Sequence, residues 1–327
     1  MDAENIRTLI EKFDNTTVLV IGDLMLDRYL KGTMSRISPE APAPLVEITS
    51  ERYQLGGAAN AINTICNLGG KVLAVGVVGD DWFGKRLIGL LNQKNVDTSG
   101  LIEIKERPTT VKTRVIASQQ YIIRLDREDR EKISPEESTP LLEFINKNAE
   151  KIDVILISDY DKGVITNTLM KGIIETAKKF HKPVIVYPKI GNLLEYKGIT
   201  LVITDLEKAS SLTGIRQINE TSIRNMGQWM LTHLECDYIL ITRGAEGMSL
   251  FTQDGSVFHV PAHAGKIHTI TGNVDAIASV ISLCLASGIP TMNDSVHLAN
   301  LAAEIVLESP EGMILTREHL ERKIGVN

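Results

Sequence analysis

The stretch HTITGNVDA, residues 268–276, could bind an anion at the start of a helix. Gly272 ends one element, and Asp275 opens the apolar run AIASVISLCLASG, which is typical of a buried helix. The first N–H groups of such a helix are unpaired, and together with the helix dipole they attract an anion. Asn273 and Val274, however, stand where a phosphate-binding loop favours residues without bulk. The stretch is therefore a catalytic loop, the remnant of one, or an ordinary helix start.

Two further segments suggest contacts with a polar ligand. In GDLMLD, Asp23 and Asp27 follow an apolar run and could bind sugar hydroxyls. Each could instead cap the following segment, and this alternative is stronger for Asp27 than for Asp23. In GGAAN, residues 56–60, Gly56 and Gly57 allow close approach of the backbone to a ligand, with Asn60 on the next helical turn. A tight turn would explain the same glycines.

Several other side chains are candidates for binding charged groups. Lys112, Arg114 and Arg124 could meet an anionic substrate, although exposed charges on strands are the simpler explanation. SDYDKG (158–163) supplies Asp159 and Lys162, and YPK supplies Lys189. TRGAEG supplies Thr242, Gly244 and Gly247, which indicate either a loop lying against a nucleotide or a hairpin turn. The seven histidines lack an HxxxH-type spacing, so we expect no transition-metal site.

The elements that would position these residues alternate along the chain. Apolar runs at 17–23, 71–81, 153–160, 182–189, 199–205 and 237–244 predict strands, and helical patterns follow them, as at 58–70 and 82–95. Strands without polar alternation are buried on both faces, which predicts a mostly parallel sheet covered by helices. Ligands bind such folds at the carboxyl ends of the strands, where the polar residues above occur.

Two segments depart from this pattern. Residues 34–55 and 109–129 alternate apolar and polar side chains, and prolines interrupt the first. They predict a few antiparallel strands outside the main sheet, forming a small flap over the strand ends. Such a flap suits a lid that excludes water or a dimer interface, and both roles are equally consistent with the pattern.

The composition excludes several classes of protein. The 327 residues are 23% charged and 43% hydrophobic, with a net charge of −6 and a pI near 5.7, so nucleic acid is not an expected partner. No apolar run reaches membrane-spanning length, and MDAENIRTLIEKFDN indicates an amphipathic helix rather than a signal peptide. Three separated cysteines favour a reducing compartment, and we expect a cytoplasmic protein.

In order, GD…D, SRISPEAPAP, GGAAN, RPTTVKTRV…QQYIIRLD, SDYDKG, PK, TRGAEGM and TGNVD resemble the PfkB/ribokinase superfamily of ATP-dependent sugar kinases. The flap motifs are most similar to bacterial D-glycero-β-D-manno-heptose-7-phosphate kinases. The resemblance implies a ribokinase-like three-layer α/β/α fold, with a β flap from about residues 30–50 and 108–127. It also implies transfer from ATP, with Mg²⁺, to the anomeric hydroxyl of a sugar phosphate. The alternating patterns of the flap segments motivate a further expectation, a homodimer joined through the flap.

The resemblance also implies a role for each matching residue. Asp275 is expected as general base, with Lys189 and Gly272 in the catalytic group. The residues expected at the sugar phosphate are Asp23, Gly56, Gly57, Asn60, Lys112, Arg124, Asp159 and Lys162. Those expected at the nucleotide are Thr242, Gly244, Gly247, Thr271, Asn273 and Asn300, and Asp205 is the candidate metal ligand, through a water. Some relatives carry a fused nucleotidyltransferase domain; because this chain ends at Asn327, we expect a single kinase domain, 1–327, without it.

The chain departs from the family pattern around the phosphates. Asn273 and Val274 replace the Ala and second Gly of the Thr-Gly-Ala-Gly-Asp loop, and Val274 cannot easily adopt the positive φ of a glycine. The segment DLEK aligns with the family's Asn-x-x-Glu motif and has Lys208 in place of the Glu, which weakens a magnesium site. The segment YPKI aligns with the family's Asp-Pro-Lys-Gly motif and has Tyr187 and Ile190 in place of the Asp and the Gly.

Two hypotheses follow. One is an active kinase with altered phosphate contacts, favoured because Asp275 and Lys189 are kept. The other is a kinase-fold protein that binds a sugar phosphate or nucleotide without efficient transfer. A nicotinamide-binding Rossmann domain is excluded, because no GxGxxG follows the first strand.

Overall fold

A mostly parallel sheet forms the centre of the molecule. The computed structural model describes residues 3–189, 196–262, 272–288, 291–309 and 313–325. Within these residues the sheet has nine strands in the order β13-β12-β11-β10-β9-β8-β1-β4-β5, and only the β12 pairings are antiparallel. The strands are β1 (Thr17–Gly22), β4 (Lys71–Gly79), β5 (Asp97–Ile104), β8 (Val154–Ser158), β9 (Val184–Tyr187), β10 (Leu201–Asp205), β11 (Tyr238–Thr242), β12 (Met248–Thr252) and β13 (Val257–Val260).

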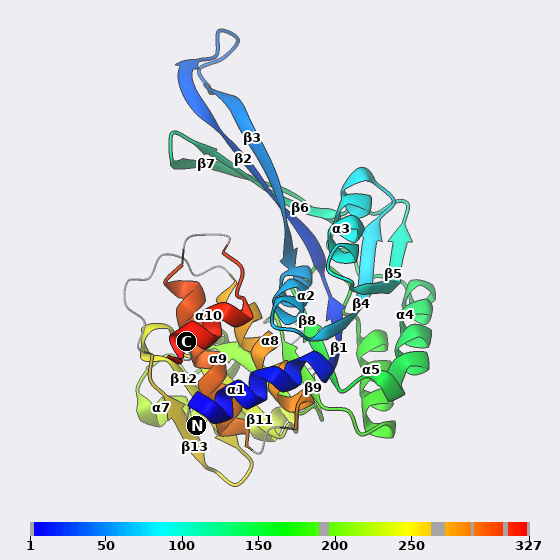
Figure 1. Ribbon diagram of the computed structural model, residues 1–327, viewed down its shortest axis with the longest axis vertical. Coiled ribbons are helices and arrows are strands. Elements are labelled where there is room, and N and C mark those ends of the chain that lie inside the picture. Colours follow the sequence, from blue (N-terminus) through cyan, green and yellow to red (C-terminus); the bar gives the residue numbers. More distant parts are fainter. Residues whose placement is uncertain (1–2, 190–195, 263–271, 289–290, 310–312, 326–327) are drawn as a thin grey trace.

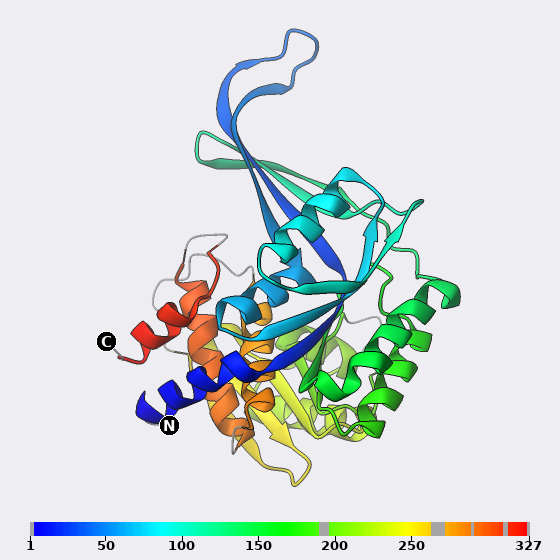
Figure 2. The same cartoon turned by 45° about the vertical axis from the view of Figure 1, so that its right-hand side comes forward.

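Helices cover both faces of the sheet, which confirms the predicted three layers (Figures 1 and 2). In β1, Val18 and Val20 point into one apolar core, whereas Leu19 and Ile21 point into the other. The first core is closed by α1 (Ala3–Lys12), α2 (Ala58–Asn67), α3 (Trp82–Asn92), α8 (Asn273–Ala286), α9 (Met292–Leu307) and α10 (Arg317–Lys323). The second is closed by α4 (Pro135–Asn148), α5 (Asn167–Lys179), α6 (Leu206–Thr213) and α7 (Glu220–Leu234).

The predicted flap is a second sheet of four strands, ordered β3-β2-β6-β7. It projects away from the α/β body, and its hairpin tips lie at the far end (Figure 1). Prolines 39 and 42 lie between β2 and β3, where no ladder hydrogen bond is lost. The strands are β2 (Leu24–Ile37), β3 (Pro44–Gly57), β6 (Thr110–Ala117) and β7 (Gln120–Arg127).

Two details of the flap differ from the prediction. β2 begins at Leu24, directly beyond β1, so the flap extends well outside the expected 30–50. The hairpins β2–β3 and β6–β7 are antiparallel, but β2 and β6 pair in parallel. Both strands leave the edge of the body in the same direction, and the chain joins them through β3, α2, β4, α3 and β5 rather than through a tight turn.

None of the helices in the part of the chain that the structure describes is long and apolar enough to cross a membrane.

Candidate active site

A pocket lies between the base of the flap and the ends of the main-sheet strands. This flap pocket has a volume of about 220 Å³. It brings together residues from both hairpins of the flap, from α2 and from the start of α8, which are far apart in the sequence. Its lining residues are Met25, Asp27, Gly56, Gly57, Asn60, Lys112, Arg114, Tyr160, Tyr187, Gly272, Asn273, Val274 and Asp275.

Asp275 is a buried carboxylate on the first turn of α8, and its side chain is held on two sides. It is 6% exposed. Asn60 Nδ2 donates to Oδ2 at 2.7 Å, and the Tyr160 hydroxyl donates to Oδ1 at 2.6 Å. Burial raises the pKa of Asp275 to about 6, although both hydrogen bonds lower it. A carboxyl group with this pKa is ionised at neutral pH yet basic enough to accept a proton from a hydroxyl.

The backbone before Asp275 differs from the expectation for Val274. The positive φ falls on Gly272, at 83°, which is the residue before α8. Val274 lies within the helix and needs no left-handed conformation, so that part of the sequence argument was wrong. Its side chain nevertheless lines the pocket, as its bulk suggested.

Asn60 reaches Asp275 because Gly57 permits a sharp turn from β3 into α2. Gly57 has φ of 54°, and a Cβ there would lie 2.6 Å from the Asp23 carbonyl oxygen and 2.5 Å from Met25 Cε. No other residue fits this position without moving the backbone. α2 then packs beside α8, where Ser279 Oγ donates to the Ala61 carbonyl at 3.2 Å.

Asp23 lies beneath the pocket rather than in it. Its side chain is 1% exposed and accepts the backbone N–H groups of Tyr160 (2.8 Å), Lys162 (3.1 Å) and Val164 (3.2 Å). Burial, with the nearby Asp159 charge, raises the pKa of Asp23 to about 6. Asp23 therefore folds the SDYDKG loop and so positions the Tyr160 hydroxyl. The carboxylate that lines the pocket is Asp27, the one for which capping was the stronger alternative.

The cations of the flap base form a network with acidic side chains. Lys112 lines the pocket, with Nζ 3.6 Å from Asp126 and 3.9 Å from Glu128. Lys162 Nζ donates to Glu128 at 2.7 Å. Burial raises the pKa of Glu128, but Lys162, Arg130 and Lys112 outweigh this and lower it to about 2.

Three further charged residues of this region are the predicted site residues Arg114, Arg124 and Asp159, and each has its own contacts. Arg114 pairs with Asp27 inside the pocket. Arg124, half-exposed on β7, pairs with Asp126 and lies outside the pocket lining. Asp159 is buried, where it accepts from the Tyr196 hydroxyl and from the Asp161 N–H.

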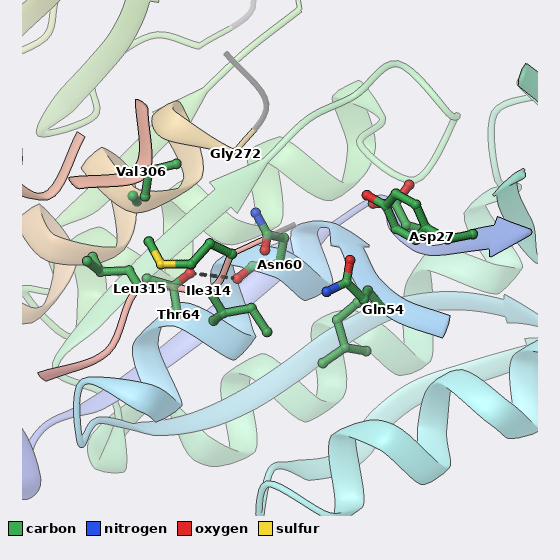
Figure 3. A pocket seen from close by; sticks show the side chains of 12 residues that line it. Asp27, Gln54, Asn60, Thr64, Gly272, Val306, Ile314 and Leu315 are labelled. Carbon is green, nitrogen blue, oxygen red and sulfur yellow. Dashed lines mark hydrogen bonds between the residues drawn. The ribbon is translucent and has the colours of Figure 1, made fainter. Parts of the chain in front are cut away.

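A narrower side pocket continues from Asp27, Asn60 and Gly272 toward the C-terminal segment (Figure 3). Gln54 and Thr64 line its polar part, and Val306, Ile314 and Leu315 line its apolar end. The Thr64 hydroxyl donates to the Asn60 carbonyl at 3.0 Å, which holds the first turn of α2 in place.

A larger pocket of about 500 Å³ lies at the ends of β10 and β11. This strand-end pocket is lined by all six of the described residues predicted at the nucleotide and metal, namely Asp205, Thr242, Gly244, Gly247, Asn273 and Asn300. Gly244–Glu246 is a short 3₁₀ turn between antiparallel β11 and β12. The hairpin turn predicted for TRGAEG is therefore present, and it forms part of the pocket wall.

The two pockets meet at Tyr187, Asn273 and Val274, which line both. These three residues also depart from the family pattern. The structure thus gathers the unusual residues at one boundary, between the pocket that holds Asp275 and the larger pocket beside it.

The candidate metal ligand, Asp205, is committed to other contacts. Its Oδ1 accepts the Lys208 N–H at 2.8 Å, capping α6, and its Oδ2 lies 3.0 Å from Lys208 Nζ. Across residues 3–189, 196–262, 272–288, 291–309 and 313–325, no group of three or more His, Cys, Asp or Glu side chains is arranged to hold a metal ion. Magnesium favours near-octahedral oxygen ligands, usually with free carboxylates. The side chains at Asp205 do not fit that requirement.

Some predicted residues lie elsewhere. Lys189 is exposed and lines neither pocket, Lys162 is buried and also lines neither pocket, and Thr271 falls outside the described residues. Sequence reasoning missed the role of Tyr160. Its position directly after Asp159, at the end of an apolar run, was the available signal. Tyr187 was noticed only as a mismatch, although it lines both pockets.

Comparison with known proteins decides the family. The model of the pfkB family carbohydrate kinases matches residues 15–318. The chain belongs to the pfkB family of carbohydrate kinases. This is a family of carbohydrate kinases, which use ATP together with a metal.

Relatives of this pfkB kinase include the bifunctional protein HldE of Geobacter sulfurreducens, 38% identical over 307 residues, and that of Geobacter metallireducens, 39% identical over 307 residues. The alignments cover 94% of this chain and 62% of each relative, so the chain spans less than two thirds of their length.

Solved structures show the same fold. Escherichia coli phosphofructokinase-2 in complex with potassium has a TM-score of 0.77 at 18% identity, covering 94% of this chain and 97% of that one. Arabidopsis thaliana ribokinase complexed with ribose and ATP has a TM-score of 0.73 at 16% identity, covering 95% and 98%. The predicted ribokinase-like fold is confirmed.

Proposed function

We propose that this pfkB kinase transfers the γ-phosphoryl group of ATP to the anomeric hydroxyl of a sugar phosphate, converting a heptose 7-phosphate to a heptose 1,7-bisphosphate. The observation that carries the proposal is the placement of Asp275. It is a buried carboxylate with a pKa of about 6 that lines the flap pocket at the start of a helix, directly after the boundary residue Val274.

The reaction needs a base and a way to balance negative charge. Asp275 accepts the proton of the attacking hydroxyl, whose oxygen forms a bond to the γ-phosphorus as the bond to ADP breaks. Tyr160 and Asn60 hold the carboxylate in place through their hydrogen bonds. The unpaired N–H groups at the start of α8, next to Gly272, face the charge that develops on the phosphoryl oxygens.

The flap pocket is assigned to the sugar phosphate. Asp27, Asn60 and the backbone at Gly56 and Gly57 offer hydrogen bonds to sugar hydroxyls. The substrate phosphate is assigned to Lys112, with Lys162 and Arg124 adding positive charge. These three cations are paired with only two carboxylates, those of Asp126 and Glu128. An arriving phosphate group therefore replaces a carboxylate as the partner of these cations. The HldE relatives support a heptose substrate.

The strand-end pocket is assigned to ATP. Its volume suits a nucleotide, and its wall is formed by the Gly244–Gly247 turn and by Thr242 and Asn300. Thr271, directly before Gly272, is proposed at the phosphates on the strength of the family pattern alone.

A coupled assay of ADP release tests the assignment. The parent chain is compared on heptose 7-phosphate, free heptose, fructose 6-phosphate and ribose, with ATP and Mg²⁺. Heptose 7-phosphate should give the highest kcat/KM, and loss of the sugar phosphate group should reduce it. A higher kcat/KM on ribose or fructose 6-phosphate would reject the heptose assignment.

We further propose a cytoplasmic homodimer joined through the flap. Tyr121, Ile123 and Leu125 of β7 are each about half exposed. They alternate with Arg124 and Asp126, so they lie on the face of the flap turned away from the ion pairs with Asp126. An apolar surface of this kind on a projecting sheet favours association. The free cysteines 66, 236 and 284 are in keeping with a reducing compartment.

Light scattering during gel filtration tests the dimer. The parent chain should elute with twice the mass of the 36.0 kDa chain. Ile123→Glu should halve that mass, whereas Lys171→Glu on α5, an exposed site in the body, should leave it unchanged. A parent chain of 36.0 kDa at assay concentrations would reject the dimer.

A further inference from the structure

Lys208 is a cation fixed against the wall of the strand-end pocket. Its neighbours in the chain, from Asp205 to Glu207, line that pocket, as does Tyr187. Lys208 Nζ donates to the Tyr187 hydroxyl at 2.8 Å, lies 3.0 Å from Asp205 Oδ2, and is 4.1 Å from the centroid of the Tyr187 ring. The Lys208 side chain is only 13% exposed. Contacts with two different strand ends therefore hold the ammonium in one place.

Opposite charge holds the ammonium in this position. Asp205 Oδ2 lies 3.0 Å from Nζ, and the Tyr187 hydroxyl accepts a hydrogen bond from Nζ at 2.8 Å. A lysine ammonium is a compact charge that binds phosphate well. The cluster therefore places an ammonium group, paired with one carboxylate, beside the boundary of the two pockets, where the phosphates of a nucleotide would lie.

The same contacts remove the acidic groups that would attract a divalent cation. The Asp205 carboxylate is neutralised by Lys208, and its second oxygen caps α6. Glu207, the other acid of this turn, is exposed. A divalent cation placed here would approach the ammonium at short range, which is unfavourable.

We propose that Lys208, held by Asp205 and Tyr187, supplies the positive charge that binds nucleotide phosphates, so that this chain binds metal-free nucleoside di- and triphosphates. The proposal rests on the assignment of the strand-end pocket to the nucleotide, made above. It concerns nucleotide binding and not the transfer step.

Calorimetric titration with ADP tests the proposal, because ADP has no γ-phosphoryl group to transfer. The parent chain is titrated once in excess EDTA and once in excess Mg²⁺. We expect Kd values that agree within about threefold, a difference of less than 1 kcal/mol. Lys208→Glu should weaken binding of ADP in EDTA by roughly 10- to 100-fold, the range for losing a hydrogen bond to a charged group.

Two variants accompany Lys208→Glu. Lys208→Met removes the charge without adding a carboxylate, so it tests the proposal even where Lys208→Glu does not fold, and it should lose about 10-fold in EDTA. Lys171→Glu, at an exposed site on α5, makes the same change in net charge and should bind ADP like the parent.

The outcomes separate this proposal from the proposed function. If the parent binds ADP only with Mg²⁺, or if Lys208→Met binds it in EDTA as tightly as the parent, the role of Lys208 is refuted while the nucleotide pocket stands. If ADP binds under neither condition, both the role of Lys208 and the assignment of the pocket are refuted.

Discussion

Replacing Tyr160 by Phe should move the acid limb of the pH–activity profile. The Tyr160 hydroxyl donates to Asp275 at 2.6 Å, and burial, followed by the Asp275 charge and this hydrogen bond, raises the pKa of Tyr160 well above its usual value. The hydroxyl is therefore a donor throughout any practical pH range. Because it stabilises the ionised carboxylate and not the neutral acid, its removal raises the pKa of Asp275.

The size of the effect follows from the hydrogen bond. A bond to a charged group contributes about 1.5–3 kcal/mol, which corresponds to a rise of about one to two pH units in the acid limb. In the parent, a pKa of about 6 leaves Asp275 roughly nine-tenths ionised at pH 7. In Tyr160→Phe that fraction falls to between about a half and a tenth, so kcat/KM at pH 7 should fall about 2- to 10-fold and recover by pH 9.

The assay is the pH dependence of kcat/KM, which reports the free enzyme. Tyr238→Phe, a partly buried tyrosine at the start of β11 that lines neither pocket, is the matched control and should retain the parent profile. A loss that is the same at every pH would show that Tyr160 acts by packing or by substrate contact. In that case, the reasoning about the base would be refuted.

Three further predictions concern named residues. Asp275→Asn should lower kcat by about 10²–10⁴-fold with ADP affinity retained, which single-turnover kinetics and calorimetry check. The same change should stabilise the fold, because a carboxyl whose pKa rises from 3.8 to about 6 on folding costs roughly 3 kcal/mol when ionised. The gain in Tm should be about 4 °C at pH 8 and about half of that at pH 5. A change in Tm that is the same at both pH values would contradict this assignment of the destabilisation to the ionised carboxylate. Gly57→Ala should lose at least about 1–2 kcal/mol from its positive φ, plus the clash with the Asp23 carbonyl, and an unchanged Tm would count against the turn. Lys112→Ala should weaken binding of the phosphorylated sugar more than binding of the free sugar, and Arg124→Ala should show the same preference with a smaller loss. Equal losses for both sugars would contradict a contact with the phosphate.

Much of the fold could be predicted because its strands are unusually clear. An uninterrupted apolar run such as Thr17–Gly22 has few alternatives to a buried strand, and its observed bounds agree with the prediction to a residue. The location of the flap was predictable for the opposite reason, its alternating pattern. The parallel pairing of β2 with β6 could not be predicted, because five other elements, β3, α2, β4, α3 and β5, lie between these two strands in the chain.

The site was predictable only in part. Asp23 and Asp27 are four residues apart and chemically the same, but one lies at the end of β1 and the other along β2. Only the packing shows that the first is enclosed by the SDYDKG backbone, whereas the second faces the pocket. Lys208 appeared in the sequence as a reversed charge. Its partner Tyr187 became visible once β9 and β10 lay side by side.

The sequence by itself determined the elements, the family motifs and the identity of the candidate base, because these depend on residue types and short spacings. The tertiary structure alone decided what that base can do. The groups that hold Asp275 lie 115 and 215 residues away along the chain, and the burial that raises its pKa to about 6 comes from helices and strands packed around it. A pKa depends on distances to neighbouring charges and donors and on the exclusion of water, and no local stretch of sequence contains either quantity.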